Sequence, residues 1–299
     1  METLKNQAHR WGVILAGGDG TRLLSLTRQL TGDDTPKQFC ALTGRDTLLT
    51  QTRKRVARNI PDGQVLYLLT EKHRRFFASQ LRDVDPWRLL VQPYNHGTAP
   101  AIVWSLARLQ HLDPNGVVAF FPSDHHFDND ATFAAHVDLA FRDADANADR
   151  VVLIGVTPDA PEEAYGWIEP GKSLSDAAFE VTRFWEKPSR RVAAQLMLQG
   201  CLWNSFVMVG RIGAFLDLVR GTLPTLLAEL QSIAATPDPG AQRLERLYDS
   251  LPAANFSDDV LAMRPSALAV LRTRELGWSD LGEPQRVFSL FPMQEMAVA

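Results

Sequence analysis

The sequence has few cysteines, no long apolar segment and no excess of positive charge, and each shortage argues against a class of protein. Its 299 residues include only Cys40 and Cys201, so a scaffold stapled by several disulfides is excluded and a reducing cytoplasm fits. No apolar run approaches the ~20 residues of a membrane helix, and the polar residues 1–10 lack the apolar core of a signal peptide. The formal net charge of −4 provides no global field for nucleic acid. We therefore expect a cytoplasmic protein with neither membrane nor nucleic-acid partners.

What the sequence does contain is an alternation of short apolar runs with longer amphipathic stretches. Its 45% hydrophobic and 22% charged residues are typical of a globular protein. Apolar runs of strand length occupy residues 11–16, 64–70, 88–92, 116–121 and 151–155. Helical patterns lie between them at residues 46–60, 72–81, 98–112, where Thr98 is expected to cap the helix and Pro100 to fit its first turn, and 129–143. The alternation predicts an α/β fold, with helices flanking a mostly parallel, Rossmann-like sheet.

After residue 155 the regular alternation of strand and helix patterns ends. Strands are expected at residues 164–170, 179–187, 203–210 and 267–273, and helices at residues 193–199, 214–230 and 242–251. The first two of these strands are joined by a turn rich in Gly, Ser and Asp, which predicts a small antiparallel lobe attached to the sheet. No linker is evident, so we expect one domain over residues 11–288, an N-terminal extension over 1–10 and a C-terminal tail over 289–299.

A glycine-rich loop directly follows the first predicted strand. A Walker loop would have Gly-Lys-Ser/Thr where Gly20, Thr21 and Arg22 stand, and a dinucleotide fingerprint would have Gly or Ala in place of Leu23, so neither motif fits. Glycines let the backbone approach a phosphate, and Arg22 adds a fork of donors. The loop predicts a phosphate site rather than a plain turn. The expected nucleotide-binding residues of this loop are Leu15, Ala16, Gly17, Gly18, Gly20 and Thr21.

Further motifs follow this loop in a fixed order, and together they resemble the mannose-1-phosphate guanylyltransferase branch of the sugar-1-phosphate nucleotidyltransferases. That family opens with a strand, then Gly-Gly-x-Gly-Thr-Arg-Leu and Pro-Lys-Gln-Phe. Here the similar segments are residues 15–23, 36–39, 92–93 with 97–102, 122–125, 165–168, 184–188, 203–205 and 278–280. The resemblance spans residues 11 to about 282 and implies the nucleotide-diphospho-sugar transferase fold, with the small lobe on the sugar side.

The resemblance also implies a role for each matching residue. Arg22 and Lys37 would neutralise the triphosphate, and Asp124 and Asp280 would be the Mg²⁺ ligands; these four are the expected catalytic residues. Besides the glycine loop, the expected nucleotide-binding residues are Gln92, Gly97, Thr98 and Ala99. The expected sugar-phosphate-binding residues are Tyr165, Gly166, Glu186, Lys187 and Asn204.

The implied reaction is an in-line attack of a sugar 1-phosphate on the α-phosphorus of a nucleoside triphosphate, with release of pyrophosphate. GTP and mannose 1-phosphate are the expected pair. A phosphate monoester has a second pKa of about 6, so the nucleophile is already largely dianionic at neutral pH and needs no general base. The task of the site is therefore to position anions and to offset their charge.

The sequence departs from the family pattern at two places. His96-Gly97 stands where the family often has Arg-Asn, and Phe206 stands where it often has Gly, which bear on the base contacts and on the sugar pocket. Residues 31–35 look like a short insertion. Long family members carry a further C-terminal module, for which this chain is expected to have no room after Asp280.

Several alternatives remain open. The nearest alternative is the same reaction with another substrate pair, glucose 1-phosphate with dTTP or UTP. Another alternative is a non-catalytic nucleotide-binding regulatory homologue. A glycosyltransferase would need an Asp-x-Asp motif, which Ser123-Asp124-His125 does not supply. His125 and His126 lack a third ligand at the spacing of a zinc site. A homodimer is possible.

Overall fold

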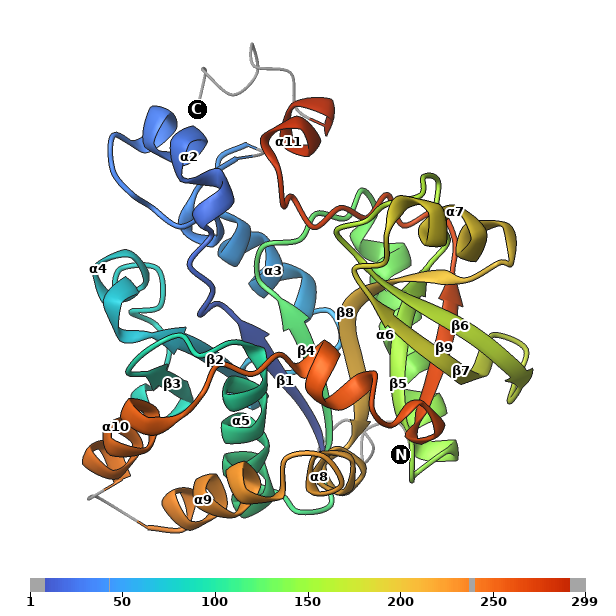
Figure 1. Ribbon diagram of the computed structural model, residues 1–299. Coiled ribbons are helices and arrows are strands. Elements are labelled where there is room, and N and C mark those ends of the chain that lie inside the picture. Colours follow the sequence, from blue (N-terminus) through green and yellow to red (C-terminus); the bar gives the residue numbers. More distant parts are fainter. Residues whose placement is uncertain (1–8, 43, 237–239, 291–299) are drawn as a thin grey trace.

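The computed structural model describes residues 9–42, 44–236 and 240–290, which form an α/β molecule around one nine-stranded sheet (Figure 1). One half of the sheet has the order β3-β2-β1-β4, with every pairing parallel. Its strands are β1 (Arg10–Leu15), β2 (Val65–Thr70), β3 (Leu89–Gln92) and β4 (Val117–Pro122). These confirm the predicted strands to within one residue at each end, because continuous apolar runs suit strands that are covered on both faces.

The other half of the sheet closes on itself. Its strands are β5 (Val151–Val156), β6 (Gly166–Ser173), β7 (Ala178–Glu186), β8 (Leu202–Arg211) and β9 (Leu268–Thr273). They follow the order β8-β5-β9-β7-β6, and β6 also pairs with β8, so the five strands form a small barrel. The prediction of a mostly parallel sheet with an antiparallel lobe is therefore wrong in part. β5 and β9 pair in parallel, β8 runs antiparallel to β4, and the lobe shares its strands with the main sheet.

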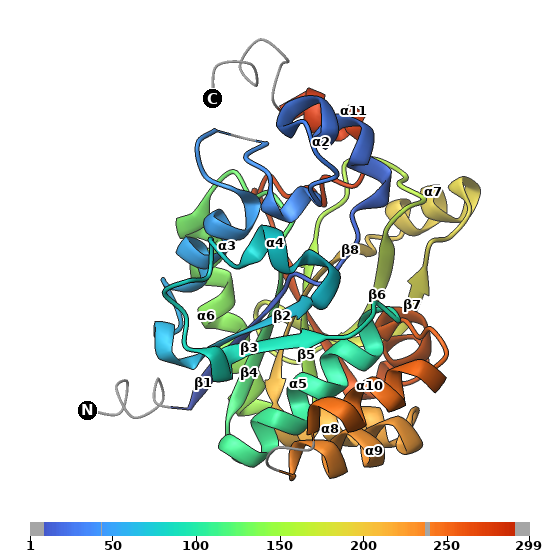
Figure 2. The ribbon, with the colours of Figure 1, turned by 90° about the vertical axis from the view of Figure 1, so that its left-hand side faces the viewer.

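Helices cover both faces of the sheet and divide the core into two large apolar clusters. One face is covered by α5 (Thr98–Leu112), α8 (Ile212–Arg220), α9 (Pro224–Ala234) and α10 (Gly240–Ser250). The other carries α3 (Leu48–Val56), α4 (Arg74–Phe77), α6 (Asp130–Ala146) and α7 (Arg190–Leu198). A third, smaller cluster joins α2 (Leu24–Thr31) to α11 (Pro284–Leu290), which lie together at the top of Figures 1 and 2.

Three local predictions need correction. The single helix expected at residues 214–230 is two helices, because Pro224 begins α9 as its first residue. The helix expected at residues 72–81 is a 3₁₀ turn, Glu71–His73, followed by the short α4. Gly97 rather than Thr98 is the N-cap of α5, and the Thr98 hydroxyl instead accepts from the backbone N–H of Phe256 at 2.8 Å.

Most of the predicted N-terminal extension and C-terminal tail lies outside the described residues, which begin at residue 9 and end at residue 290. Within that part of the chain, no helix combines the length and the apolar character needed to cross a bilayer.

Candidate active site

The glycine loop leaves the carboxyl end of β1 and is held from outside. Gln38 donates from its side-chain amide to the carbonyls of Gly18 at 2.7 Å and of Ala16 at 3.2 Å. Gly17 has no room for a side chain, since a Cβ there would lie 2.9 Å from Gln92 Nε2 and 3.0 Å from Thr70 Oγ1. Because Gln38 engages carbonyls, its contacts hold the loop without occupying any of the loop's N–H groups, which is the arrangement that an anion-binding loop requires.

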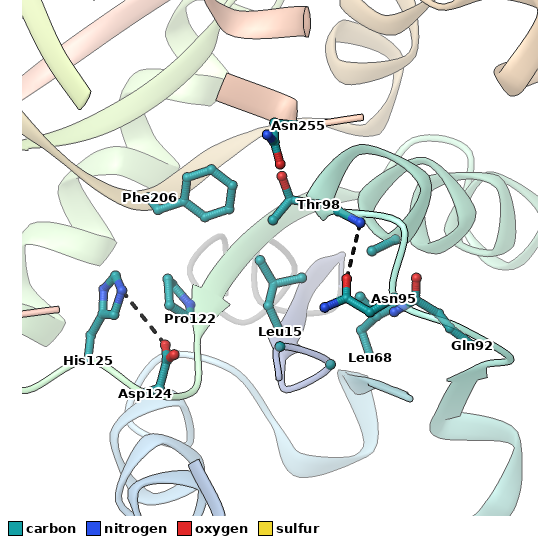
Figure 3. Close-up of a pocket in the computed structure, with 14 residues that line it drawn as sticks. Leu15, Leu68, Gln92, Asn95, Thr98, Pro122, Asp124, His125, Phe206 and Asn255 are labelled. Atoms are coloured by element: carbon teal, nitrogen blue, oxygen red, sulfur yellow. Dashed lines mark hydrogen bonds and ion pairs between the residues drawn. The ribbon is translucent and has the colours of Figure 1, made fainter. Parts of the chain in front are cut away.

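Two cavities meet at this loop. The first, of about 380 Å³, is shown in Figure 3 and lies over the ends of β1 and β4. Its lining is Leu15, Gly17, Gly18, Leu68, Gln92, Asn95, Gly97, Thr98, Ala101, Pro122, Asp124, His125, Phe206 and Asn255. The second, of about 540 Å³, is lined by Asp19, Gly20, Thr21, Arg22, Leu23, Lys37, Asn95, Asp124, Asn255 and Gly282. Asn95, Asp124 and Asn255 line both, so the two cavities form one continuous site.

The first cavity has a rigid wall around Gln92. Its side-chain carbonyl accepts from the hydroxyl of Tyr248 on α10 at 2.9 Å, and both groups are buried. Gly97 turns the chain into α5 at φ +88°, where a Cβ would lie only 2.3 Å from the carbonyl oxygen of Ala254. Gln92, Gly97 and Thr98, which are expected to bind the nucleotide, line this cavity. Ala99 does not, because its side chain is fully buried and its N–H donates to Ala254.

The second cavity holds the two predicted cations. Arg22 is exposed, and within the described residues it makes no hydrogen bond or ion pair, so its guanidinium is available to a ligand. Lys37 is buried, and its ammonium lies 3.2 Å from Asp124 Oδ2. The same ammonium donates to the backbone carbonyl of Asp280 at 2.6 Å and to that of Leu281 at 3.1 Å. Lys37 therefore connects the segments that carry the two predicted acids.

A short β-bridge completes this connection. His126 and Ser279 pair in antiparallel fashion, with N–H to O distances of 2.8 and 3.1 Å, so the turn after β4 and the turn after β9 lie side by side. Asp124 and Asp280, 156 positions apart in sequence, are thus brought to one end of the site. His125 lies between them, accepting from the indole N–H of Trp278 at 3.1 Å.

The two carboxylates differ in their surroundings. The Asp124 side chain is 29% exposed, and Lys37 is the cation nearest to it. The Asp280 side chain is 16% exposed, and its Oδ1 accepts from Arg286 at 2.5 Å, Gly282 N–H at 2.8 Å and Tyr165 at 3.2 Å. Burial raises the pKa of Asp280, but the positive charges around it, Lys37 and Arg286 among them, outweigh this effect and hold the pKa below its ordinary value. Asp280 is therefore a carboxylate at neutral pH.

The donors at this end of the site fit Mg²⁺. Within the described residues, no group of three or more His, Cys, Asp and Glu side chains is arranged to hold a metal ion. Magnesium does not require one, because it is commonly bound through one or two carboxylates, with phosphate oxygens and water completing the octahedron. Asp124 opens into both cavities, and Asp280 lies beside it across Lys37, so the two could share an ion with the phosphates of a ligand.

The predicted sugar-side residues lie on the barrel, apart from the lining of these two cavities. Tyr165 packs between Trp203 and Trp278, with ring centroids 5.0 and 4.8 Å apart, and reaches Asp280 through its hydroxyl. Gly166 pairs with Glu186, whose carboxylate forms an ion pair with Lys187. Asn204 is buried, and its side-chain carbonyl accepts from the N–H of Phe206 at 3.0 Å. Through Tyr165 the structure joins this group to Asp280.

Sequence reasoning missed several residues of the site. Asn95 accepts from Gly97 N–H at 3.1 Å (Figure 3) and donates to Asp19 Oδ2 at 3.1 Å. These two contacts link the glycine loop to the start of α5. Asn255 comes from a loop with no recognisable motif, so nothing in the sequence identifies it. Gln38 lies inside the Pro-Lys-Gln-Phe segment, and its place in that motif is the feature of the sequence that could have identified it as a site residue.

Phe206 has an unusual backbone for its residue type. Its φ is +60°, in the left-handed region that favours glycine, and its ring lines the first cavity. This backbone conformation explains why glycine, which the family often has at this position, suits it. The phenylalanine here takes up space in the cavity at the expense of backbone strain.

Comparisons with known proteins agree with this geometry. Residues 11–295 match the family model described as nucleotidyl transferase. The ManC mannose-1-phosphate guanylyltransferase of Salmonella typhimurium is 32% identical over 291 residues, which cover 93% of this chain and 59% of that protein. A mannose-1-phosphate guanylyltransferase of Klebsiella pneumoniae is 29% identical over 290 residues, covering 95% and 60%. The chain thus spans about three fifths of the length of these curated relatives.

Solved structures show the same fold. The Thermus thermophilus protein described as a mannose-1-phosphate geranyltransferase superposes with a TM-score of 0.81 at 27% identity, covering 94% of this chain and 79% of that one. A putative glucose-1-phosphate thymidylyltransferase from Bacillus anthracis, at 17% identity and a TM-score of 0.59, supports the fold alone. With nearly the whole sequence matched by the family model, and the glycine loop, Lys37 and the two acids gathered at one site, the chain belongs to the nucleotidyl transferase family.

Proposed function

We propose that this protein is an enzyme that transfers a nucleoside monophosphate from a nucleoside triphosphate to a sugar 1-phosphate, releasing pyrophosphate, and that its substrates are GTP and mannose 1-phosphate. The observation that carries the proposal is the buried Lys37 ammonium, which contacts Asp124 and the backbone of Asp280 where a glycine-loop cavity meets a second pocket. The mannose 1-phosphate part is supported by the names of the two relatives and of the Thermus structure, and the guanylyl part by the names of the two relatives alone.

In this proposal the nucleoside occupies the first cavity and its triphosphate the second. Gln92, Gly97 and Thr98 would contact the base, and the N–H groups of the glycine loop would bind phosphate oxygens. Arg22 and Lys37 would offset the negative charge of the triphosphate and the charge that develops on the departing pyrophosphate. Asp124 and Asp280 would hold Mg²⁺, which supplies further positive charge to the phosphates when it is bound.

The sugar phosphate would enter from the barrel side. Lys187 and Glu186 would contact its phosphate and hydroxyls, and Asn204 offers a donor and an acceptor for the ring. Tyr165 stands at the junction, since it contacts Asp280 and the tryptophans of the barrel. Because the nucleophile is already dianionic, these residues act by orienting it in line with the α-phosphorus rather than by removing a proton.

A substrate panel tests this proposal. Pyrophosphate release would be measured with GTP, dTTP and UTP, each combined with mannose 1-phosphate and glucose 1-phosphate, with and without Mg²⁺. We expect GTP with mannose 1-phosphate to turn over fastest, and only with the metal. Turnover of another pair alone would contradict the substrate assignment. Nucleotide binding without turnover of any pair would contradict the catalytic assignment and favour a regulatory homologue.

A further inference from the structure

A groove that is separate from the two cavities of the candidate active site lies over β3. It has a volume of about 490 Å³, within the ~300–1,000 Å³ range of small-molecule sites. β3 forms its floor, and α5, α9 and α10 contribute walls; β3, α5 and α10 lie near one another in Figure 2. β3 is also at an edge of the sheet, because among the described strands it pairs with β2 alone. None of the residues to which we have assigned a role in the proposed reaction lines this groove.

The groove combines aromatic surface with an uncompensated positive charge. Trp87 is 44% exposed and Trp104 is half-buried, so both offer ring surface to a ligand. Arg108 is half-buried one helical turn after Trp104 on α5, and in the described chain it has no hydrogen bond or ion pair. Arg74, at the rim, is by contrast already held by both oxygens of Glu71, at 2.6 and 2.8 Å. One guanidinium is thus neutralised, and the other has no partner among the described residues.

A half-buried cation in a groove that is also lined by two indole rings has a defined chemical preference. The guanidinium has lost part of its hydration and gains no compensating contact from residues 9–42, 44–236 and 240–290, so an anion would bind it favourably. Indole surface stacks on planar rings and gains little from a bare anion. An aliphatic ligand would leave Arg108 unpaired. The combination fits a ligand that carries a planar ring and a phosphate together.

The elements that build this groove also build the nucleotide cavity. α5 presents Thr98 to the cavity at its first turn and Trp104 and Arg108 to the groove further along. β3 presents Gln92 to the cavity and its preceding residues to the groove. α10 presents Leu244 to the groove and, one turn later, the Tyr248 hydroxyl that fixes Gln92. A ligand in the groove therefore contacts the three elements that position the proposed base site.

From these observations we infer that the groove is a second ligand site, separate from the proposed active site, that binds a nucleoside phosphate through Trp87, Trp104 and Arg108. The ring lies against the tryptophans and the phosphate pairs with Arg108. Arg74 adds a second, weaker positive contribution because Glu71 already holds it.

The test counts ligands on the intact protein with GDP as the probe. Isothermal titration calorimetry should find one more equivalent of GDP on the native protein than on Arg108→Glu. Trp87→Ala should bind the same extra equivalent at least fivefold more weakly. Arg142→Glu is the matched control, because Arg142 is an exposed helical arginine on α6, on the opposite face of the sheet, and it should keep the native stoichiometry. Circular dichroism confirms that each variant is folded, and Arg108→Gln replaces any glutamate variant that is not.

The outcomes separate this site from the active site. The difference in stoichiometry between the native protein and Arg108→Glu reports on the groove, whereas the equivalent that remains on Arg108→Glu reports on the nucleotide cavity. Guanosine and inorganic pyrophosphate should each occupy the groove at least tenfold more weakly than GDP, because each lacks one half of the ligand. Equal stoichiometry and affinity for the native protein and Arg108→Glu would overturn the inference, as would binding of pyrophosphate as tightly as GDP.

Discussion

The two halves of the sheet present their acidic residues in different ways. In the parallel half, Asp124 follows β4, opens into both cavities and has Lys37 as its nearest cation. In the barrel half, Asp280 follows β9 and is held through one oxygen by Arg286, Tyr165 and Gly282. One carboxylate is open to an incoming ion, and the other is already bound within the protein. If the proposed Mg²⁺ binds here, Asp124 would receive it first, and Asp280 would have to exchange or share its contacts.

The largest effect is expected from a substitution of Asp124, the carboxylate that opens into both cavities. Asp124→Asn keeps the size of the side chain but removes its charge, so it should lower kcat by about 10³-fold, through loss of the proposed metal ligand and of the partner of Lys37. Steady-state kinetics with saturating Mg²⁺ measures this. A variant that retains native kcat within tenfold would mean that Asp124 is not a metal ligand.

A second prediction concerns the turn into α5 in the parallel half. Gly97→Ala places a methyl group against the Ala254 carbonyl at a backbone angle that alanine rarely adopts, so it should destabilise the fold by about 1–3 kcal/mol. Urea denaturation measures the loss. Gly213→Ala is the control, since that position on α8 has open space around it and alanine favours helices there. Equal stability of the two variants would contradict the structure of this turn.

The third prediction concerns Asp280, the carboxylate that is already held within the protein. Arg286→Gln removes the cation that holds Asp280, so the apparent Mg²⁺ constant should become about tenfold tighter, equivalent to ~1.4 kcal/mol of relieved charge competition. Rates measured across a Mg²⁺ titration give the constant. An unchanged constant would show that Asp280 does not exchange Arg286 for the ion. Arg183→Gln, on β7, is a control in which a barrel arginine that lies over Trp185 is replaced away from Asp280.

The smallest effect is expected from a substitution of Tyr248, which supports Gln92 from behind the proposed base site. Tyr248→Phe removes the hydrogen bond to Gln92 and leaves a buried acceptor unpaired, which costs about 1 kcal/mol and should raise the KM for the nucleotide about fivefold with kcat unchanged. Tyr94→Phe is the matched control, because Tyr94 is exposed. If both variants kept the native KM, Gln92 would not be a base contact.

The sequence predicted the parallel half more fully than the barrel. Every strand of β1 to β4 could be located because each is a continuous apolar run, and the glycine loop could be located because it follows the first of them. The barrel escaped prediction because its closure depends on the pairing of β6 with β8, and the pairing partners of a strand leave no local pattern. Pro224 shows the same limit, since a helical pattern continued across a residue that starts a new helix.

The candidate site, like the fold, could be predicted from the sequence only in part. Arg22, Lys37 and Asp124 stand in short motifs, and the structure places them at neighbouring cavities. Arg286 and Asn255 could not be found, because their contribution depends on contacts between segments far apart in the chain. Ala16 and Ala99 lie in motifs as well, yet their side chains are buried, so a motif does not tell which of its members face the ligand.

The closed barrel also sets an order for the folding of the chain. The parallel half uses strands within residues 10–122 and can pair as soon as those residues are synthesised. β5 has to wait for β9, because Val151 lies opposite Leu268 in the parallel register between them. Such distant pairing slows folding and leaves apolar strands uncovered meanwhile. The emerging chain therefore leaves the edge of β5 that pairs with β9 uncovered during the synthesis of more than a hundred residues, whereas β8 can cover the other edge earlier, and this half is where we expect a chaperone to act.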